Sequence, residues 1–286
     1  MGDFSRRRLF QVAGAGLAAG LLPAFPAPLA AQAPEGTAGN GQFHGLRVGV
    51  ATYSLRKFTY DQVLQDMKLF QVHYMSIKSF HLPLDSTPAQ IREARQRAED
   101  IGVKIPSCGV IYLKDNDAIM TQALEYGTHL GVETIVVGMN AEMLPRLNRL
   151  IKNYDVKIAI HNHGPHDPLF PSPLEAYKAA LPYDRRIGIC MDIGHTFRMG
   201  EDVAKDVLTT RDRLYCMHFK DVRSHIYNYG VQVGTGLIPE IPILKALLAI
   251  GFKGDVELEY EAQADHPIPG MMESFGFMRG ALQALA

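Results

Sequence analysis

Residues 156–164 read VKIAIHNHG, and residues 186–195 read RIGICMDIGH. In each stretch a short apolar run ends in histidine or aspartate. The same pattern returns in residues 213–221, RLYCMHFKD, and in residues 255–261, DVELEYE. Apolar runs of this length, rich in β-branched residues, are typical of strands. The four stretches therefore predict strands that carry polar side chains at their carboxyl ends.

Four further runs of the same kind precede these. The eight expected strands cover residues 47–52, 74–79, 103–110, 133–138, 156–161, 186–192, 213–219 and 255–260. Successive strands are far enough apart for one helix each, and eight strand–helix units in about 240 residues predict a single-domain α/β fold, the (β/α)8 TIM barrel. The alternative is a doubly wound sheet, which usually carries a glycine-rich phosphate loop after its first strand. Residues 51–55, ATYSL, are no such loop.

The segments between the strands carry the signals of helix ends. Thr87-Pro88 with Gln90 predicts a capped helix start, and Ser172-Pro173 repeats it. An apolar stripe at 3.6-residue spacing, which would pack on a sheet, and glycines suited to helix ends support the same reading. These residues are Ile91, Ala94, Ala98 and Ile101 for the stripe, and Gly102, Gly131 and Gly251 for the ends.

Composition excludes several classes of protein. The chain has 286 residues, a net charge of −1 and 47% hydrophobic residues, which fits a folded globular protein and argues against a disordered chain. Near-neutral charge also argues against a nucleic-acid partner, which needs many lysines and arginines. Cys108, Cys190 and Cys216 are too few and too scattered for a disulfide scaffold or a CxxC zinc site. We expect Cys190 and Cys216 to fill the core.

The first 33 residues have the layout of an export signal. Residues 5–10, SRRRLF, precede an apolar stretch at 12–22, and Ala-Gln-Ala at 31–33 fits a signal peptidase site. The paired arginines resemble a twin-arginine signal, so we expect a periplasmic protein without a stable membrane anchor after cleavage. The alternative is an uncleaved N-terminal anchor. Residues 34–45 are expected to form a flexible lead-in and residues 46–286 the barrel.

Four of the strand ends supply a set of metal ligands. Chemistry in such barrels gathers where strands end, and His161, Asp192, His218 and Glu259 end four consecutive strands. A lone buried histidine is usually a satisfied core residue, but a coincidence over four strands favours a site. Imidazoles and carboxylates together suit one divalent ion such as Mn, Co, Ni or Zn.

Further side chains near strand ends are candidates for catalysis and substrate binding. Lys78 is either a group that polarises a substrate oxygen or a solvated lysine, and Lys220 is either a site residue or an ion-pair partner of Asp221. The catalytic candidates are Glu259, His163, His195 and Lys78, and the substrate-binding candidates are His81, Lys220, Tyr53 and Tyr112.

Three motifs in this order resemble a known family. Asp192–His195 fits D-x-G-H, His218–Asp221 fits H-x-K-D, and Glu259-Tyr260-Glu261 ends the last strand. Over residues 46–262 the sequence resembles the xylose isomerase-like TIM-barrel family, the sugar phosphate isomerase/epimerase and endonuclease IV-type superfamily. The resemblance implies a divalent metal held by two glutamates, an aspartate and a histidine. Asp192, His218 and Glu259 match three of these positions, and His161 stands where epimerases of the family have the first glutamate.

The resemblance implies proton abstraction next to a carbonyl, with an enediolate intermediate that leads to isomerisation, epimerisation or elimination. Because His161 replaces one of two paired carboxylates, His163, His195 or Lys78 would supply the second proton-transfer group. We expect an exported enzyme acting on a small carbohydrate. One version is a 3-keto-glycoside lyase that works downstream of a sugar 3-oxidoreductase. An endonuclease IV-like phosphodiesterase and a non-catalytic sugar-binding barrel are the alternatives, and a homo-oligomer stays open.

Overall fold

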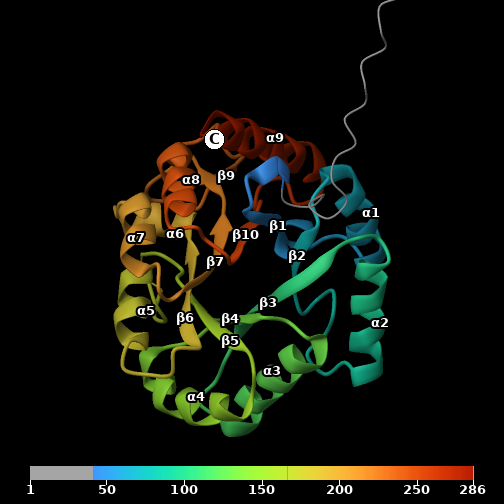
Figure 1. Ribbon diagram of the computed structural model, residues 1–286, viewed down its shortest axis with the longest axis vertical. Coiled ribbons are helices and arrows are strands. Elements are labelled where there is room, and N and C mark those ends of the chain that lie inside the picture. The colour runs from blue at the N-terminus through green and yellow to red at the C-terminus, as the bar shows by residue number, and fades with distance from the viewer. Residues whose placement is uncertain (1–40, 166, 286) are drawn as a thin grey trace, which may run out of the picture. The chain divides into compact units, whose positions relative to one another are not determined.

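Eight parallel strands close into a barrel in the computed structural model, which describes residues 41–165 and 167–285. The ring runs β1-β10-β7-β6-β5-β4-β3-β2, and helices surround it (Figure 1). The strands are β1 Arg47–Ala51, β2 Tyr74–Ile77, β3 Lys104–Tyr112, β4 Thr134–Gly138, β5 Lys157–His161, β6 Ile187–Asp192, β7 Leu214–Phe219 and β10 Asp255–Leu258. All eight predicted strands are confirmed, and the closed ring excludes the doubly wound alternative.

The helices begin where the sequence places their caps. Thr87 accepts a hydrogen bond from the backbone N–H of Gln90 in a complete capping box, and Ser172 accepts one from Leu174. Gly131 ends its helix in the left-handed conformation. The helices are α1 Tyr60–Phe70, α2 Pro88–Glu99, α3 Asp117–Leu130, α4 Leu144–Leu150, α5 Pro173–Ala180, α6 Ile193–Arg198, α7 Val203–Thr210, α8 Glu240–Ala249 and α9 Ile268–Leu285.

Two apolar layers hold the barrel together. The larger one lies between strands and helices, and the stripe of α2 contributes Ile91, Ala94 and Ala98 to it. A smaller cluster contains Cys190 and Cys216, which face each other on β6 and β7 and are both free and buried. Asp192 and His218 follow them by two residues and so lie on the same face of each strand.

The structure differs from the sequence prediction near both the start and the end of the barrel. A short antiparallel ribbon, β8 Asp221–Val222 with β9 Gly230–Val231, follows β7 and was not predicted. Of the flexible lead-in expected over 34–45, residues 34–40 lie outside the described residues, and Gly41–Phe43 forms a 3₁₀ turn with Phe43 fully buried. The predicted export signal, residues 1–33, lies outside the described residues.

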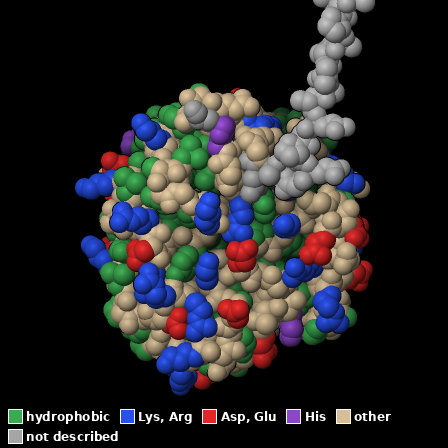
Figure 2. Space-filling view, viewed as in Figure 1, with side chains coloured by type: hydrophobic (Ala, Val, Ile, Leu, Met, Phe, Trp, Pro, Cys, Tyr) green, Lys and Arg blue, Asp and Glu red, His purple; other side chains and the backbone are tan. Residues whose placement is uncertain are grey.

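On the face drawn in Figure 2, basic and acidic side chains are interspersed. Within the described part of the chain, no helix combines the length and apolarity required to cross a bilayer.

Candidate metal centre

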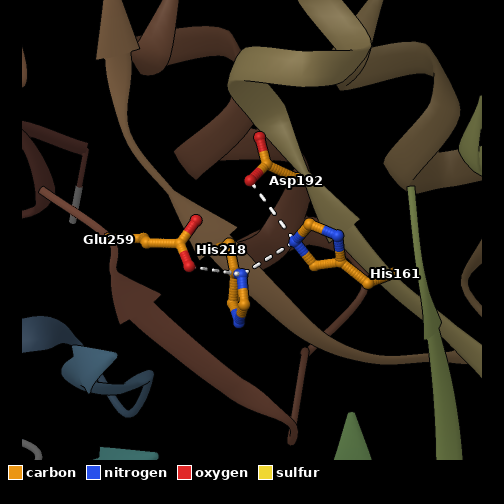
Figure 3. Close-up of side chains that lie close together, drawn as sticks. All are labelled: His161, Asp192, His218 and Glu259. Atoms are coloured by element: carbon orange, nitrogen blue, oxygen red, sulfur yellow. Dashed lines mark hydrogen bonds and ion pairs between the residues drawn. The ribbon is translucent and has the colours of Figure 1, made fainter. Parts of the chain in front are cut away.

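Four side chains from neighbouring strands meet at the carboxyl ends of the barrel (Figure 3). His161 ends β5, Asp192 ends β6, His218 lies in β7 and Glu259 follows β10. His161 Nε2 is 2.9 Å from His218 Nδ1 and 3.4 Å from Asp192 Oδ2, and His218 Nδ1 is 3.3 Å from Glu259 Oε1. All four side chains are buried, and one ligand atom from each lies within 4.8 Å of the others.

The local structure of β6 and α6 fixes the aspartate. Asp192 is the N-cap of α6, and its Oδ1 accepts the backbone N–H of His195 at 2.8 Å. The backbone N–H of Asp192 in turn donates to Asn162 Oδ1 at 2.9 Å. With Oδ1 engaged by the helix, Oδ2 is the oxygen that faces His161. Asp192 thus starts a helix with one carboxylate oxygen and directs the other into the cluster.

Lys220 lies among the carboxylates of the centre. Its Nζ is 2.8 Å from Asp192 Oδ2, 2.6 Å from Glu259 Oε2 and 2.9 Å from Glu261 Oε1, and the side chain is 2% exposed. The alternative ion pair with Asp221 is wrong, because Asp221 instead accepts backbone N–H groups of Val222 and the following loop. A buried ammonium among three carboxylates balances charge that would otherwise be costly to bury.

The donor set fits a divalent cation. Two imidazole nitrogens and two carboxylate oxygens converge in one small volume, and this mixture of donors suits zinc, manganese, cobalt or nickel. No other group of three or more such ligands converges in residues 41–165 and 167–285. The four side chains predicted as ligands are therefore the four that the fold brings together.

Most of the chain matches one family of known proteins. The family model described as xylose isomerase-like TIM barrel matches residues 67–281. The chain belongs to this family. A comparison with curated protein sequences gave no match.

Solved structures share the fold of this xylose isomerase-like barrel. The IolI protein with a bound zinc atom is 17% identical, with a TM-score of 0.70 over 84% of this chain and 99% of that one. A D-tagatose 3-epimerase-like protein is 17% identical, with a TM-score of 0.68 over 84% and 98%. L-ribulose 3-epimerase is 15% identical, with a TM-score of 0.66 over 84% and 95%. At these identities the likeness establishes the fold alone.

The glycine of the D-x-G-H motif has a direct steric reason in this xylose isomerase-like barrel. A Cβ on Gly194 would lie 2.7 Å from both Cγ and Cδ of Lys220. That side chain cannot move aside freely, since its Nζ is held by Asp192 and Glu259. Gly194 therefore allows Lys220 to pass over α6 and reach the carboxylates.

Burial and neighbouring charge set the protonation of the four candidate ligands. Burial lowers the pKa of His161 well below its ordinary value, so this imidazole is neutral and has a lone pair to donate. Burial alone would also lower the pKa of His218, but Cys190 and the Glu259 carboxylate raise it well above the ordinary value. For Asp192 and Glu259, burial is outweighed by nearby positive charge, including Lys220, which lowers both pKa values.

These directions predict a pH-dependent metal affinity. His218 is protonated below its raised pKa and must lose that proton to ligate, whereas His161 and both carboxylates are already deprotonated at neutral pH. One released proton makes the apparent affinity fall about tenfold for each pH unit below the pKa of His218. Titration with Zn²⁺ or Co²⁺ against a chelator between pH 5.5 and 8.5 measures this slope. A flat profile would contradict the assignment of His218 as a ligand.

The other two predicted histidines, His163 just after β5 and His195 in α6, also lie here. The ring centroids of His161 and His163 are 4.6 Å apart, and those of His161 and His195 are 6.0 Å apart. His163 Nε2 lies 3.0 Å from the hydroxyl of Tyr112, the last residue of β3. His195 Nδ1 lies 3.1 Å from Nη1 of Arg198, which sequence reasoning did not single out. Burial lowers the pKa of both His163 and His195.

Lys78 and His81, two of the predicted site residues, make different kinds of contact. Lys78 follows β2, and its Nζ lies 5.3 Å from the ring centroid of Tyr53. Burial lowers the pKa of Lys78, opposed by the charge of Glu259. His81 is turned to the backbone, with Nε2 3.0 Å from the carbonyl of Phe58. The charge of Lys78 thus interacts with that of Glu259 in the centre. His81 instead contacts the backbone of the loop that contains Phe58.

Sequence reasoning missed two carboxylates beside Glu259. Glu257 is buried in β10, and Glu261 accepts a hydrogen bond from Lys220 and another from Asn228. The signal was present, since residues 257, 259 and 261 alternate and so share one face of an extended chain. Only the middle one was assigned, because the motif of the family marks that position.

Proposed function

We propose that this chain is a divalent-metal-dependent carbohydrate isomerase or epimerase-type enzyme. The convergence of His161, Asp192, His218 and Glu259 from four adjacent strands is the observation that carries the proposal. Membership of the xylose isomerase-like family and fold neighbours described as sugar epimerases support it. Bound by these four side chains, a divalent cation would supply Lewis acidity to a carbonyl and its neighbouring hydroxyl.

Glu259 is the group that removes a proton from the carbon next to the carbonyl. Lys220 keeps this carboxylate ionised, because its ammonium lies 2.6 Å from Oε2 and lowers the pKa of Glu259 despite burial. Loss of the proton converts the substrate into an enediolate. Return of a proton at another carbon gives an isomer, and return to the other face gives an epimer.

Lys78 is our candidate for the group that returns the proton. Its lowered pKa brings its acidity closer to neutral pH, and it follows β2, outside the four ligand-bearing strands. His163 and His195 lie beside His161. We assign to these imidazoles the orientation of substrate hydroxyls, and the 3.0 Å contact between the Tyr112 hydroxyl and His163 Nε2 supports the position of His163.

Lys78→Met is expected to lower turnover about 100-fold while metal affinity stays within about twofold of wild type, because Lys78 is not a ligand. Chelator competition measures metal affinity, and turnover is measured separately at saturating metal. Equal turnover in wild type and variant would remove Lys78 from the mechanism.

Elimination from a 3-keto-glycoside is the specific version that we propose. Glu259 would take the C2 proton, the C–H electron pair would form a C1–C2 double bond, and the C1–O bond would break. The leaving oxygen would take a proton from Lys78. Such a substrate must first be oxidised at C3, so a sugar 3-oxidoreductase would act upstream.

Solvent exchange tests the proposal directly. Mature protein is loaded with Mn²⁺, Co²⁺, Ni²⁺ or Zn²⁺ and incubated in D₂O with 3-keto-glucosides, free ketoses and, as a separate arm, abasic DNA. Deuterium entering next to the carbonyl supports the enediolate route, and release of the C1 substituent identifies elimination. Cleavage of abasic DNA alone, or failure to bind any of these ions, would overturn the proposal.

We further propose export through the twin-arginine route, with action in the periplasm. The Arg6-Arg7-Arg8 run and the Ala31-Gln32-Ala33 site support this from sequence. Fractionation followed by mass spectrometry of the N-terminus is the test. A mature protein that begins near Gln32–Pro34 in the periplasmic fraction is expected, and replacement of Arg6 and Arg7 by lysine should retain the precursor in the cytoplasm.

A further inference from the structure

A carboxylate lies inside the barrel one level below the metal centre. Glu257 precedes Glu259 by two residues on β10, faces the same interior and is 1% exposed. Interior positions of such barrels are normally filled by branched apolar side chains. On the neighbouring strand β7, Cys216 of the smaller apolar cluster lies two residues before His218, the register partner of Glu257. A carboxylate at this level is costly to bury, which indicates that it makes specific contacts.

Those contacts join two opposite parts of the barrel. Glu257 is the register partner of His218 on the neighbouring strand β7, and Oε2 of Glu257 lies 3.3 Å from Nε2 of His218. Oε1 of Glu257 accepts a hydrogen bond from the hydroxyl of Ser107 on β3. Within the described residues neither His218 Nε2 nor Glu257 Oε2 has a hydrogen-bond partner, so their 3.3 Å contact is a close polar approach between two otherwise unsatisfied buried atoms. The two atoms are therefore available to each other.

The two nitrogens of His218 consequently face different groups. Nδ1 points to the ligand atoms of His161 and Glu259, and Nε2 points to Glu257. An imidazole that donates its Nε2 proton to a carboxylate keeps its Nδ1 lone pair free, and its ring orientation is fixed. Such support commonly raises the affinity of a histidine for metal.

We propose that Glu257, held by Ser107, is a positioning residue that fixes His218 with Nδ1 directed at the metal. The inference rests on the metal-binding part of the proposed function. Metal binding would then depend on the Glu257 carboxylate, although this residue does not contact the metal. Ser107 thus holds Glu257, and Glu257 holds the imidazole of His218 from the inner side of the barrel.

Glu257→Gln is the direct test, because glutamine keeps the size and removes the negative charge. Affinity for Zn²⁺ and Co²⁺ is measured by chelator competition, and the visible absorption of the Co²⁺ form reports ligand geometry. We expect affinity to fall by about 10–100-fold and the Co²⁺ spectrum to change, with unchanged thermal unfolding of the metal-free protein. Asp206→Asn on α7 is the matched control, since it also neutralises a buried carboxylate and should change neither property.

Ser107→Ala keeps the test decisive if Glu257→Gln does not fold. It leaves the carboxylate in place but frees one of its oxygens, so a smaller loss of affinity in the same direction is expected. Folded variants with wild-type affinity and an unchanged Co²⁺ spectrum would overturn the inference while the proposed function stands. A wild-type protein that binds no divalent ion would overturn both.

Discussion

Asp192→Asn is expected to lower affinity for Zn²⁺ or Co²⁺ by roughly 100-fold or more, the largest effect of any single conservative change in the centre. Oδ1 of Asp192 caps α6 by accepting the N–H of His195, and an asparagine oxygen would keep that bond. The amide nitrogen would then replace Oδ2, the atom facing His161 and Lys220. An amide N–H cannot ligate a cation and would meet the Lys220 ammonium unfavourably.

Chelator competition at pH 8 measures this effect, with circular dichroism as the check on folding. Asp206→Asn again serves as the control, because Asp206 is a buried carboxylate of α7 that takes no part in the centre. Burial raises the pKa of Asp206 to about 7, so its neutral replacement is tolerable. Wild-type affinity in Asp192→Asn would remove this aspartate from the ligand set.

Glu259→Gln is expected to lower the rate of solvent-deuterium exchange by about 1,000-fold, even at metal concentrations that saturate the variant. The residue has two tasks, since Oε1 faces His218 Nδ1 and Oε2 contacts Lys220 Nζ. Glutamine is neutral and cannot accept a proton from carbon. Weaker metal binding accompanies the loss, but added metal should not restore the rate.

Glu261→Gln is the informative comparison for that experiment. Glu261 also contacts Lys220, yet it is not one of the four converging ligands. A loss of about tenfold or less is expected there, because only the surroundings of Lys220 change. Comparable rates in Glu259→Gln and wild type, measured at saturating metal, would show that another group removes the proton.

The strands and ligands were predictable because both depend on local chemistry. An apolar run that ends in His161 or Asp192 predicts both a buried strand and the position of its carboxyl end from only a few residues of sequence. A parallel barrel brings the carboxyl ends of its strands to the same end, so the four candidate ligands followed from the number and order of the strands. The capped starts of α2 and α5 were equally local, since Thr87 and Ser172 bond to their own helices.

Partners that lie far apart in the sequence were not predictable. Lys220 was expected either in the site or paired with the adjacent Asp221, but its contacts are Asp192, Glu259 and Glu261. The ribbon of β8 and β9 was also missed, because two-residue strands leave no periodic pattern. Which lysine meets which carboxylate depends on strand register and on the space that Gly194 leaves.

The sequence by itself determined the barrel, the order of its strands and the four residues able to ligate a metal, because residue type and spacing encode these locally. Only the tertiary structure decided which atoms converge, which nitrogen of His218 faces them, and that Ser107 and Glu257 stand beneath. Those depend on side chains from opposite strands meeting in the closed interior. A carboxylate at position 257 acquires a specific role only when the ring brings His218 and Ser107 to it.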